Sequence, residues 1–286
     1  MNIAQHAWTV IMVLVGLNGG LAVHQLRVAH AFQFHALSVG QGDAILLVTP
    51  DQHHVLIDGG PGSSVTEELG ETLPLLYRDI DLMVLTHPHL DHLEGLISVL
   101  DHYSVKALLL SAPHYSSDAY AVFLERVTEL GIPVYFAEAD TDFKLGDLKL
   151  DVLYPFESVT GESFENVNNV SVVIRADFEN HSMMLMGDAE QEVEAELLEH
   201  DVVHGPVDIL KAGHHGSRTS STEAFLEAVQ PKLMVISCGD GNDFGHPHPE
   251  TLEKAARLQI PILRTDTSGR VSVVFRGRRD DFGLPP

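Results

Sequence analysis

The chain has 286 residues, of which 44% are apolar, so it can bury the core of one large domain or of two small ones. Its 17 basic residues against 41 acidic ones give a net charge of −24, which disfavours non-specific attraction to the phosphate backbone of nucleic acids. A single cysteine, Cys238, excludes an intrachain disulfide and a cysteine-based zinc site, whereas 18 histidines offer many metal ligands.

The apolar residues 8–23 carry the only membrane signal of the sequence, and Asn18-Gly19-Gly20 interrupts them. The stretch is shorter than the roughly 20 apolar residues that cross a bilayer, so residues 1–31 are predicted to be a signal peptide or a short membrane anchor. This predicts an exported or membrane-tethered protein, periplasmic or extracellular. The first seven residues lack Lys and Arg, which weakens the secretory signal, so a buried core segment in a cytoplasmic protein is the alternative.

From Phe32 to Ile57, short apolar runs alternate with tight glycine turns, which predicts an antiparallel meander of three strands. Asp58 follows the third strand directly. A carboxylate at this position could orient a metal-bound histidine, or it could form a turn with the glycines that follow, and both interpretations stay open. The predicted strands are 32–37, 44–48 and 54–57.

The stretch Thr86-His87-Pro88-His89-Leu90-Asp91-His92 joins a predicted strand at 82–85 to a predicted helix whose apolar residues recur at helical spacing over 93–100. Buried elements fix both ends of this turn, so its side chains can converge. The first two histidines project to one side of the extended chain, while the aspartate and the last histidine come from the first helical turn. Imidazole and carboxylate ligands suit zinc or a similar metal; a polar helix start is the alternative.

The rest of the chain predicts one α/β domain, because no linker interrupts residues 32–276. We expect two sheets face to face with helices outside, followed by a polar tail at 277–286. The glutamates of the helix after Glu190 are expected to form a solvated face. The predicted strands are 105–110, 132–136, 171–175, 182–186, 207–211, 232–236, 262–264 and 271–275, with a hairpin of two strands at 144–154 around Gly146-Asp147. The predicted helices are 119–130, 190–199, 222–229 and 250–258.

Three further strand ends carry metal-ligand side chains. In each, an apolar strand runs into a polar or glycine-rich turn, so one edge of the sheets is expected to gather them all. Such convergence is what a site for two metal ions requires. The side chains are Asp188, the pair His214 and His215, and the pair His246 and His248.

We predict that these residues bind two divalent ions with a bridging hydroxide between them. His214 and His215 would point to opposite sides of an extended chain, so only one is expected to bind, with His214 slightly preferred. Two ions about 3.5–4 Å apart lower the pKa of a shared water to near neutrality. Asp91 and Asp188 would hold these ions, so they are predicted to be catalytic. The predicted ligands are His87 and His89 for one ion, Asp91, His92 and either His214 or His215 for the other, and Asp188 as the bridge.

These motifs resemble those of the metallo-β-lactamase superfamily, and more finely those of the soluble domain of the ComEC family of competence DNA-uptake proteins. The resemblance covers about residues 35–275. It implies an αββα sandwich, binuclear metal-dependent hydrolysis, a nuclease role and a membrane channel of a DNA-uptake system as partner; the helix before the domain in that family is similar to residues 8–23. The matching motifs are His87-x-His89-x-Asp91-His92, Gly187-Asp188, Val39-Gly40-Gln41-Gly42-Asp43, Leu56-Ile57-Asp58-Gly59-Gly60, Asn168-Asn169-x-Ser171, Lys211-x-Gly213-His214-His215-Gly216-Ser217, Gly245-His246-Pro247-His248-Pro249 and Thr265-Asp266.

The sequence departs from the family pattern at two places. Ser38 stands where the family usually has an aspartate, which affects no expected metal ligand. Superfamily members commonly use another histidine before the bridging aspartate, where the family pattern offers Asn169; His114 and His181 are alternatives, each expected at the surface. The first ion would then be weakly bound, which favours manganese or loosely bound zinc; zinc is the first expectation for the pair.

The remaining motif residues are predicted to meet the substrate. His246 and His248, flanked by prolines, are expected to contact a phosphate or protonate the leaving oxygen; a rigid helix start is their alternative role. Lys211 and Ser217 provide groups that a phosphate would need, and Asn169 and Ser171 follow from the resemblance.

Three functions fit these observations. The first is a phosphodiesterase, chiefly a nuclease acting on DNA, which at this net charge needs bound cations or a local basic strip. The second is hydrolysis of a lactone, a β-lactam or another acyl substrate. This alternative stays open because the negative net charge disfavours a nucleic-acid substrate. The third is a non-catalytic component of a DNA-uptake assembly.

Overall fold

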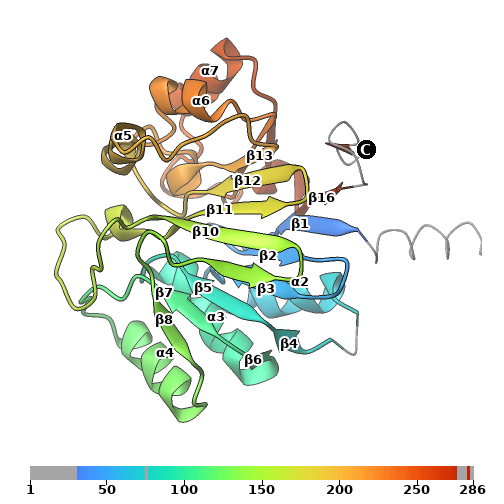
Figure 1. Cartoon of the computed structure of the whole chain (residues 1–286), viewed down its shortest axis with the longest axis vertical. Helices are drawn as coiled ribbons and strands as arrows, with labels where there is room; N and C mark the ends of the chain where they lie inside the picture. Colours follow the sequence, from blue (N-terminus) through green and yellow to red (C-terminus); the bar gives the residue numbers. More distant parts are fainter. Residues whose placement is uncertain (1–30, 75–76, 276–281, 284–286) are drawn as a thin grey trace, which may run out of the picture.

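Short runs of Val, Ile and Leu form two β-sheets that pack face to face, with helices on both outer faces (Figure 1). The computed structural model describes residues 31–74, 77–275 and 282–283. The predicted α/β class and αββα sandwich are confirmed. The predicted signal peptide or anchor lies outside the described residues, except for its last residue. Among the helices that the structure describes, none combines the length and the apolar character needed to cross a membrane.

The first sheet has eight strands: β17 (Phe282–Gly283), β16 (Val271–Phe275), β1 (Phe32–Ala36), β2 (Ile45–Val48), β3 (His54–Ile57), β5 (Leu82–Leu85), β7 (Leu108–Leu110) and β8 (Val134–Phe136). The strands β16, β1, β2 and β3 are antiparallel neighbours, which confirms the predicted meander, and β3, β5, β7 and β8 run parallel. Because β17 pairs with β16, the predicted polar tail contains a short strand.

The second sheet has seven strands: β15 (Ile262–Arg264), β14 (Leu233–Ile236), β13 (Ile209–Lys211), β12 (His181–Leu185), β11 (Val173–Phe178), β10 (Leu148–Tyr154) and β9 (Phe143–Leu145). From β9 to β12 the strands are antiparallel, and from β12 to β15 they are parallel. The short strands β4 (Asp79–Ile80) and β6 (Ser104–Val105) pair separately, so the predicted strand at 105–110 is divided between β6 and β7.

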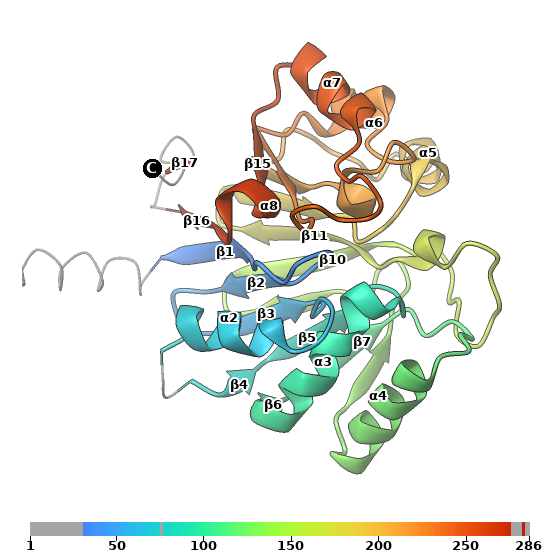
Figure 2. The ribbon, with the colours of Figure 1, turned by 180° about the vertical axis from the view of Figure 1, so that it is seen from behind.

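Helices bury the outer face of each sheet (Figure 2). Those of the first sheet are α2 (Ser64–Thr72), α3 (Leu90–His102) and α4 (Asp118–Glu129); those of the second are α5 (Gln191–Glu199), α6 (Glu223–Val229) and α7 (Pro249–Arg257); the short helices are η1 (Val167–Val170), η2 (Gly213–Gly216) and α8 (Thr265–Ser268). In β2, Leu47 faces the core between the sheets and Leu46 faces the helices. Both faces of this strand are therefore buried, which explains its unbroken apolar run.

Two polar side chains that the sequence placed at the surface are buried. Glu194, on α5, accepts hydrogen bonds from the backbone N–H groups of Ser221 and Thr222 at the start of α6. His181, at the start of β12, contacts Asp208. The surface prediction was wrong for these two residues, because partners distant in sequence satisfy their polar atoms and allow their burial. It holds for the other glutamates of α5, because Glu192, Glu196 and Glu199 are exposed.

The parallel strands explain where the polar turns gather. Their carboxyl ends meet at one edge of a sheet, which is where open α/β sheets bind ligands. Asp58 follows β3, and residues 86–92 follow β5 in the first sheet. Asp188 follows β12, and η2 follows β13 in the second sheet. The two sheets therefore bring these turns together from both sides of the sandwich.

Candidate metal centre

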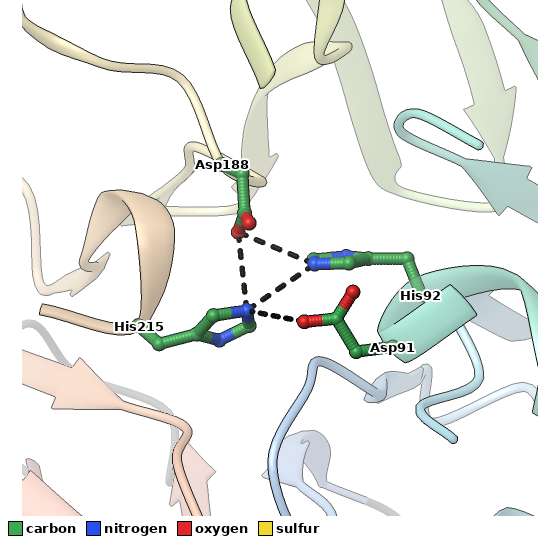
Figure 3. Close-up of side chains that lie close together, drawn as sticks. All are labelled: Asp91, His92, Asp188 and His215. Atoms are coloured by element: carbon green, nitrogen blue, oxygen red, sulfur yellow. Dashed lines mark hydrogen bonds and ion pairs between the residues drawn. The ribbon is translucent and has the colours of Figure 1, made fainter. Parts of the chain in front are cut away.

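Four side chains converge at this edge and form what we call the buried quartet: Asp91, His92, Asp188 and His215 (Figure 3). Asp91 and His92 lie in the first turn of α3, Asp188 lies just after β12, and His215 lies in η2. Each residue offers one ligand atom, and the four atoms lie within 4.8 Å of one another. Three of the four residues are almost completely buried, and Asp91 is partly exposed.

The distances within the buried quartet fit a metal ion. Asp188 Oδ1 lies 3.3 Å from His92 Nε2 and 3.4 Å from His215 Nε2, and His215 Nε2 lies 3.4 Å from Asp91 Oδ2. Ligand atoms about 2.1 Å from a tetrahedral ion are about 3.4 Å apart. Asp188 Oδ1 is also buried and has no hydrogen-bond partner among the described residues. An ion would satisfy this oxygen, so the residues fit the metal that their chemistry suggests.

Asp58 orients His92. Its Oδ2 lies 2.8 Å from His92 Nδ1, so the other ring nitrogen points to the buried quartet. The carboxylate also accepts hydrogen bonds from the backbone N–H and the hydroxyl of Thr86. A carboxylate behind a metal-binding histidine fixes its tautomer and its orientation. Of the two roles left open for Asp58, the structure shows this one.

Asp43 and a backbone carbonyl orient His215 in the same way. His215 Nδ1 lies 3.0 Å from the carbonyl oxygen of Ser237 and 3.3 Å from Asp43 Oδ1. Lys211 Nζ lies 2.7 Å from the other oxygen of Asp43. Gly42 lets this loop pass close to α3, because a Cβ at that position would lie 2.1 Å from the backbone oxygen of Asp91.

Charges within the cluster shift its titration. Burial lowers the pKa of His92. The carboxylates of Asp188 and Asp58 raise it by more, so the net pKa is well above the usual value. The same balance, with Asp188 and Asp43, raises the pKa of His215. Burial raises the pKa of Asp188, but the two histidines lower it well below its usual range. The cluster therefore keeps Asp188 ionised, as a metal ligand must be.

A second group of imidazoles, which we call the outer group, lies on the other side of Asp188: His87, His89 and His214. His87 Nε2 lies 3.0 Å from His89 Nδ1 and 3.8 Å from Asp188 Oδ2. His214 Nε2 lies 3.9 Å from the same oxygen. Burial lowers the pKa of both His87 and His89, which favours the neutral rings that metals require. The two oxygens of Asp188 thus face different sets of imidazoles.

A family model described as the metallo-beta-lactamase superfamily matches residues 37–240. The chain belongs to this superfamily. The structure of this superfamily member is similar to that of CmlA, a diiron β-hydroxylase from Streptomyces venezuelae, with a TM-score of 0.55, 16% identity and coverage of 86% of this chain and 54% of that one. It is equally similar to the Bacillus subtilis protein YhfI, with a TM-score of 0.55, 12% identity and coverage of 84% and 99%. At these identities the likeness concerns the fold alone.

Curated relatives confirm the finer resemblance of this superfamily member to competence proteins. ComE operon protein 3 of Bacillus subtilis strain 168 is 31% identical over 267 residues, which cover 87% of this chain and 34% of the relative. Recombination protein 2 of Haemophilus influenzae is 31% identical, with coverage of 85% and 29%. Competence protein ComA of Neisseria gonorrhoeae is 25% identical, with coverage of 80% and 30%. The chain spans about a third of the length of these relatives.

The structure assigns the adjacent histidines of this superfamily member differently from the sequence. His214 and His215 have φ values of 45° and 54°, so the chain there is left-handed and not extended, as the prediction assumed. His215 joins the buried quartet, whereas His214 lies near the other oxygen of Asp188. The preference for His214 as partner of Asp91 and His92 is therefore corrected to His215.

Three of the predicted substrate-binding residues are buried and contact neighbouring groups of the protein. Lys211 is buried in its ion pair with Asp43. Ser171 is buried, and its hydroxyl accepts a hydrogen bond from the backbone N–H of Asp188. Ser217 is buried beside Thr219. Because the three groups are buried and have partners within the protein, the structure does not support the substrate contacts predicted for them.

The fourth predicted substrate-binding residue, Asn169, also makes structural contacts. Its amide oxygen accepts a hydrogen bond from the backbone N–H of Glu190, and its amide nitrogen donates to Glu192. It is the neighbouring Asn168 that reaches His214, with its Nδ2 3.4 Å from the ring. No role was predicted for Asn168, Asp43 or Glu190. Asn168 and Asp43 lie within motifs of the family resemblance, which could have indicated them, whereas Glu190 lies in none of these motifs.

His246 and His248 lie beside the outer group. The ring centroid of His246 is 5.3 Å from that of His214 and 4.8 Å from that of His248. Burial, followed by the charge of His215, lowers the pKa of His246 to about 4, so its ring is neutral at pH 7. His248 precedes α7, and its Nδ1 accepts a hydrogen bond from the backbone N–H of Arg218. Both predicted positions therefore lie next to the site.

Proposed function

We propose that this chain is a binuclear metal-dependent phosphodiesterase that cleaves DNA in a DNA-uptake system. The observation that carries the proposal is the position of Asp188, whose two oxygens face the buried quartet and the outer group respectively. A carboxylate between two sets of imidazoles suits two divalent ions, with zinc the first expectation and manganese the alternative.

The residues of the chain position the ions and the substrate. Divalent ions bound in such a site lower the pKa of a water and neutralise charge on a phosphoryl group. Asp58 and Asp43 fix the imidazoles of the buried quartet, which keeps the site rigid. Nδ1 of His246 is buried and has no partner among the described residues. The neutral ring can donate one hydrogen bond to a phosphoryl or leaving oxygen.

DNA as the substrate is supported by the names of the relatives, two of which refer to competence or recombination. The net charge of −24 opposes this substrate, so bound cations must offset the repulsion at the site. The proposal also includes a membrane channel as partner and an exported or membrane-tethered location through residues 8–23. The chain spans only about a third of the length of its relatives, so the longer proteins have room for further parts.

A substrate panel tests the proposal. Protein loaded with zinc or manganese is incubated with single-stranded DNA, duplex DNA, bis-p-nitrophenyl phosphate and a β-lactam, and metal content is measured in parallel. We expect cleavage of DNA and of the phosphodiester, lost after chelation and restored by metal. Cleavage of the lactam alone would show an acyl hydrolase. Inertness toward all four with two ions bound would favour a non-catalytic component of the uptake assembly.

A further inference from the structure

We propose that His214 is the missing ligand of the first metal position, where it joins His87, His89 and Asp188 Oδ2, and that Glu190 positions it. The inference rests on the binuclear site of the proposed function but not on DNA as the substrate. It assigns the two adjacent histidines of η2 to different ions, His214 to the first and His215 to the second.

The distances around Asp188 Oδ2 carry the inference. His87 Nε2 lies 3.8 Å and His214 Nε2 lies 3.9 Å from this oxygen, and His89 Nδ1 lies 3.0 Å from His87 Nε2. Ligand atoms of a tetrahedral ion with bonds of about 2.1 Å are about 3.4 Å apart. Both distances to Asp188 Oδ2 exceed this value and the distance between His87 and His89 is shorter, so the imidazoles would have to move when an ion binds. Three imidazoles and one carboxylate oxygen supply the four ligands that a tetrahedral ion needs.

Glu190 supports His214 as the other carboxylates support the buried quartet. His214 Nδ1 lies 2.9 Å from Glu190 Oε1, which leaves Nε2 toward Asp188. Asn168 donates a hydrogen bond to Glu190 Oε1, and Asn166 donates one to Oε2. This arrangement repeats the contacts of Asp58 with His92 and fixes the ring for metal binding.

The backbone explains how two neighbouring histidines serve two ions. A left-handed conformation is uncommon for residues other than glycine and persists where the surroundings impose it. The N–H of His214 donates to the carbonyl oxygen of Gly187, which ties the turn to the residue before Asp188. The ring planes of His214 and His215 are 65° apart, with centroids separated by 6.1 Å.

The other histidines considered for this position have different partners. His114 is exposed and contacts Ser163. His181 is buried at the start of β12, whereas Asp188 follows the opposite end of that strand, and it contacts Asp208. Asn169 contacts the backbone of Glu190 and the side chain of Glu192. Only His214 of these candidates has a contact with Asp188.

Metal stoichiometry and affinity test the inference without an assay of activity. The full chain and the His214→Ala variant are titrated with zinc and with manganese by calorimetry, and bound metal is counted by mass spectrometry. We expect two ions in the native chain. The variant should retain the ion of the buried quartet and bind the first ion at least about tenfold more weakly. His102→Ala, an exposed histidine at the end of α3, is the matched control and should bind both ions normally.

A second pair of variants keeps the test decisive if His214→Ala folds poorly. Glu190→Gln should weaken the first ion by about 10–100-fold and leave the second unchanged, and Glu190→Asp should restore part of the loss. Unchanged binding of both ions in His214→Ala and Glu190→Gln would overturn the inference, as would a native chain that binds only one ion. A native chain that binds two ions, loses one in these variants and cleaves no DNA would overturn the proposed function alone.

Discussion

The two metal positions differ in how firmly the protein fixes their ligands. Both histidines of the buried quartet are completely enclosed, and each has a carboxylate behind it. In the outer group, His89 is partly exposed and the side chain of His214 is 23% exposed. Asp91 of the buried quartet is itself 31% exposed and His87 of the outer group is fully buried, so the difference lies in the histidines. Both histidines of the quartet are enclosed, whereas two of the three in the outer group reach the surface. The outer position is therefore where the metal should exchange and where a substrate should enter.

The first way to sharpen this comparison is to remove the charge of Lys211, which pairs with the carboxylate that orients His215. Lys211→Met leaves Asp43 without its buried cation, and we expect a loss of about 3–5 kcal/mol in the free energy of unfolding, measured by urea denaturation. Glu190→Gln, beneath the outer group, should cost less than about 1 kcal/mol, because its ion pair is partly exposed. A Lys211→Met/Asp43→Asn double variant should recover part of the loss. Equal losses for the two single variants would refute the difference between the positions.

The second prediction concerns the residue shared by both positions. Asp188→Asn removes one ligand oxygen and the negative charge between the imidazoles, so hydrolysis should fall by about 10²–10³-fold. The circular dichroism spectrum should remain native, because the two side chains have the same shape. The rate of phosphodiester hydrolysis and the metal content measure the effect. Retained turnover with two ions bound would contradict a bridging role for Asp188.

The third prediction concerns a variant that should weaken metal binding at the buried quartet and not at the outer position. Asp58→Asn keeps an acceptor for Thr86 but removes the carboxylate behind His92, so the affinity of the buried quartet for its ion should fall by about 10–100-fold. The outer position should be unaffected, which is the reverse of the result expected for Glu190→Gln. Thr86→Ser retains the hydroxyl and is the control. Calorimetric titration with zinc would contradict the assignment if the weaker of the two binding steps were the one that changed.

The sequence predicted the sandwich and the edge where the site lies, because both follow from local patterns. Strands such as β2 are buried on both faces and read as continuous apolar runs. Side chains of metal-ligand type follow the carboxyl ends of β5, β12 and β13. If these strands run in the same direction in two facing sheets, their ends lie at one edge and the side chains come together there. The convergence of Asp91, His92 and Asp188 was therefore predictable without a structure.

What the sequence could not predict depends on contacts between distant residues. The left-handed turn at His214 and His215 is not a preference of histidine, so only the surrounding loops reveal which ring faces which oxygen. Lys211 has the charge that a phosphate needs, but the carboxylate of Asp43, far away in sequence, occupies it. Residue type indicates what a side chain can bind, whereas the fold decides which partner it meets.

The smallest effect we predict is the contribution of the outer ion to stability, and it tests the comparison without any mutation. When free zinc equals the dissociation constant of the weaker site, binding stabilises the folded state by only about 0.4 kcal/mol, because the gain is RT ln(1 + [L]/Kd). At that concentration the tighter site is far above its own dissociation constant, and a hundredfold excess stabilises by about 2.7 kcal/mol. Stepwise chelation followed by thermal melting should therefore show a shift of about 1–2 °C for the first ion released and a larger one for the second. Two equal shifts would mean that burial of the quartet does not set its affinity, and that both ions are bound with similar strength.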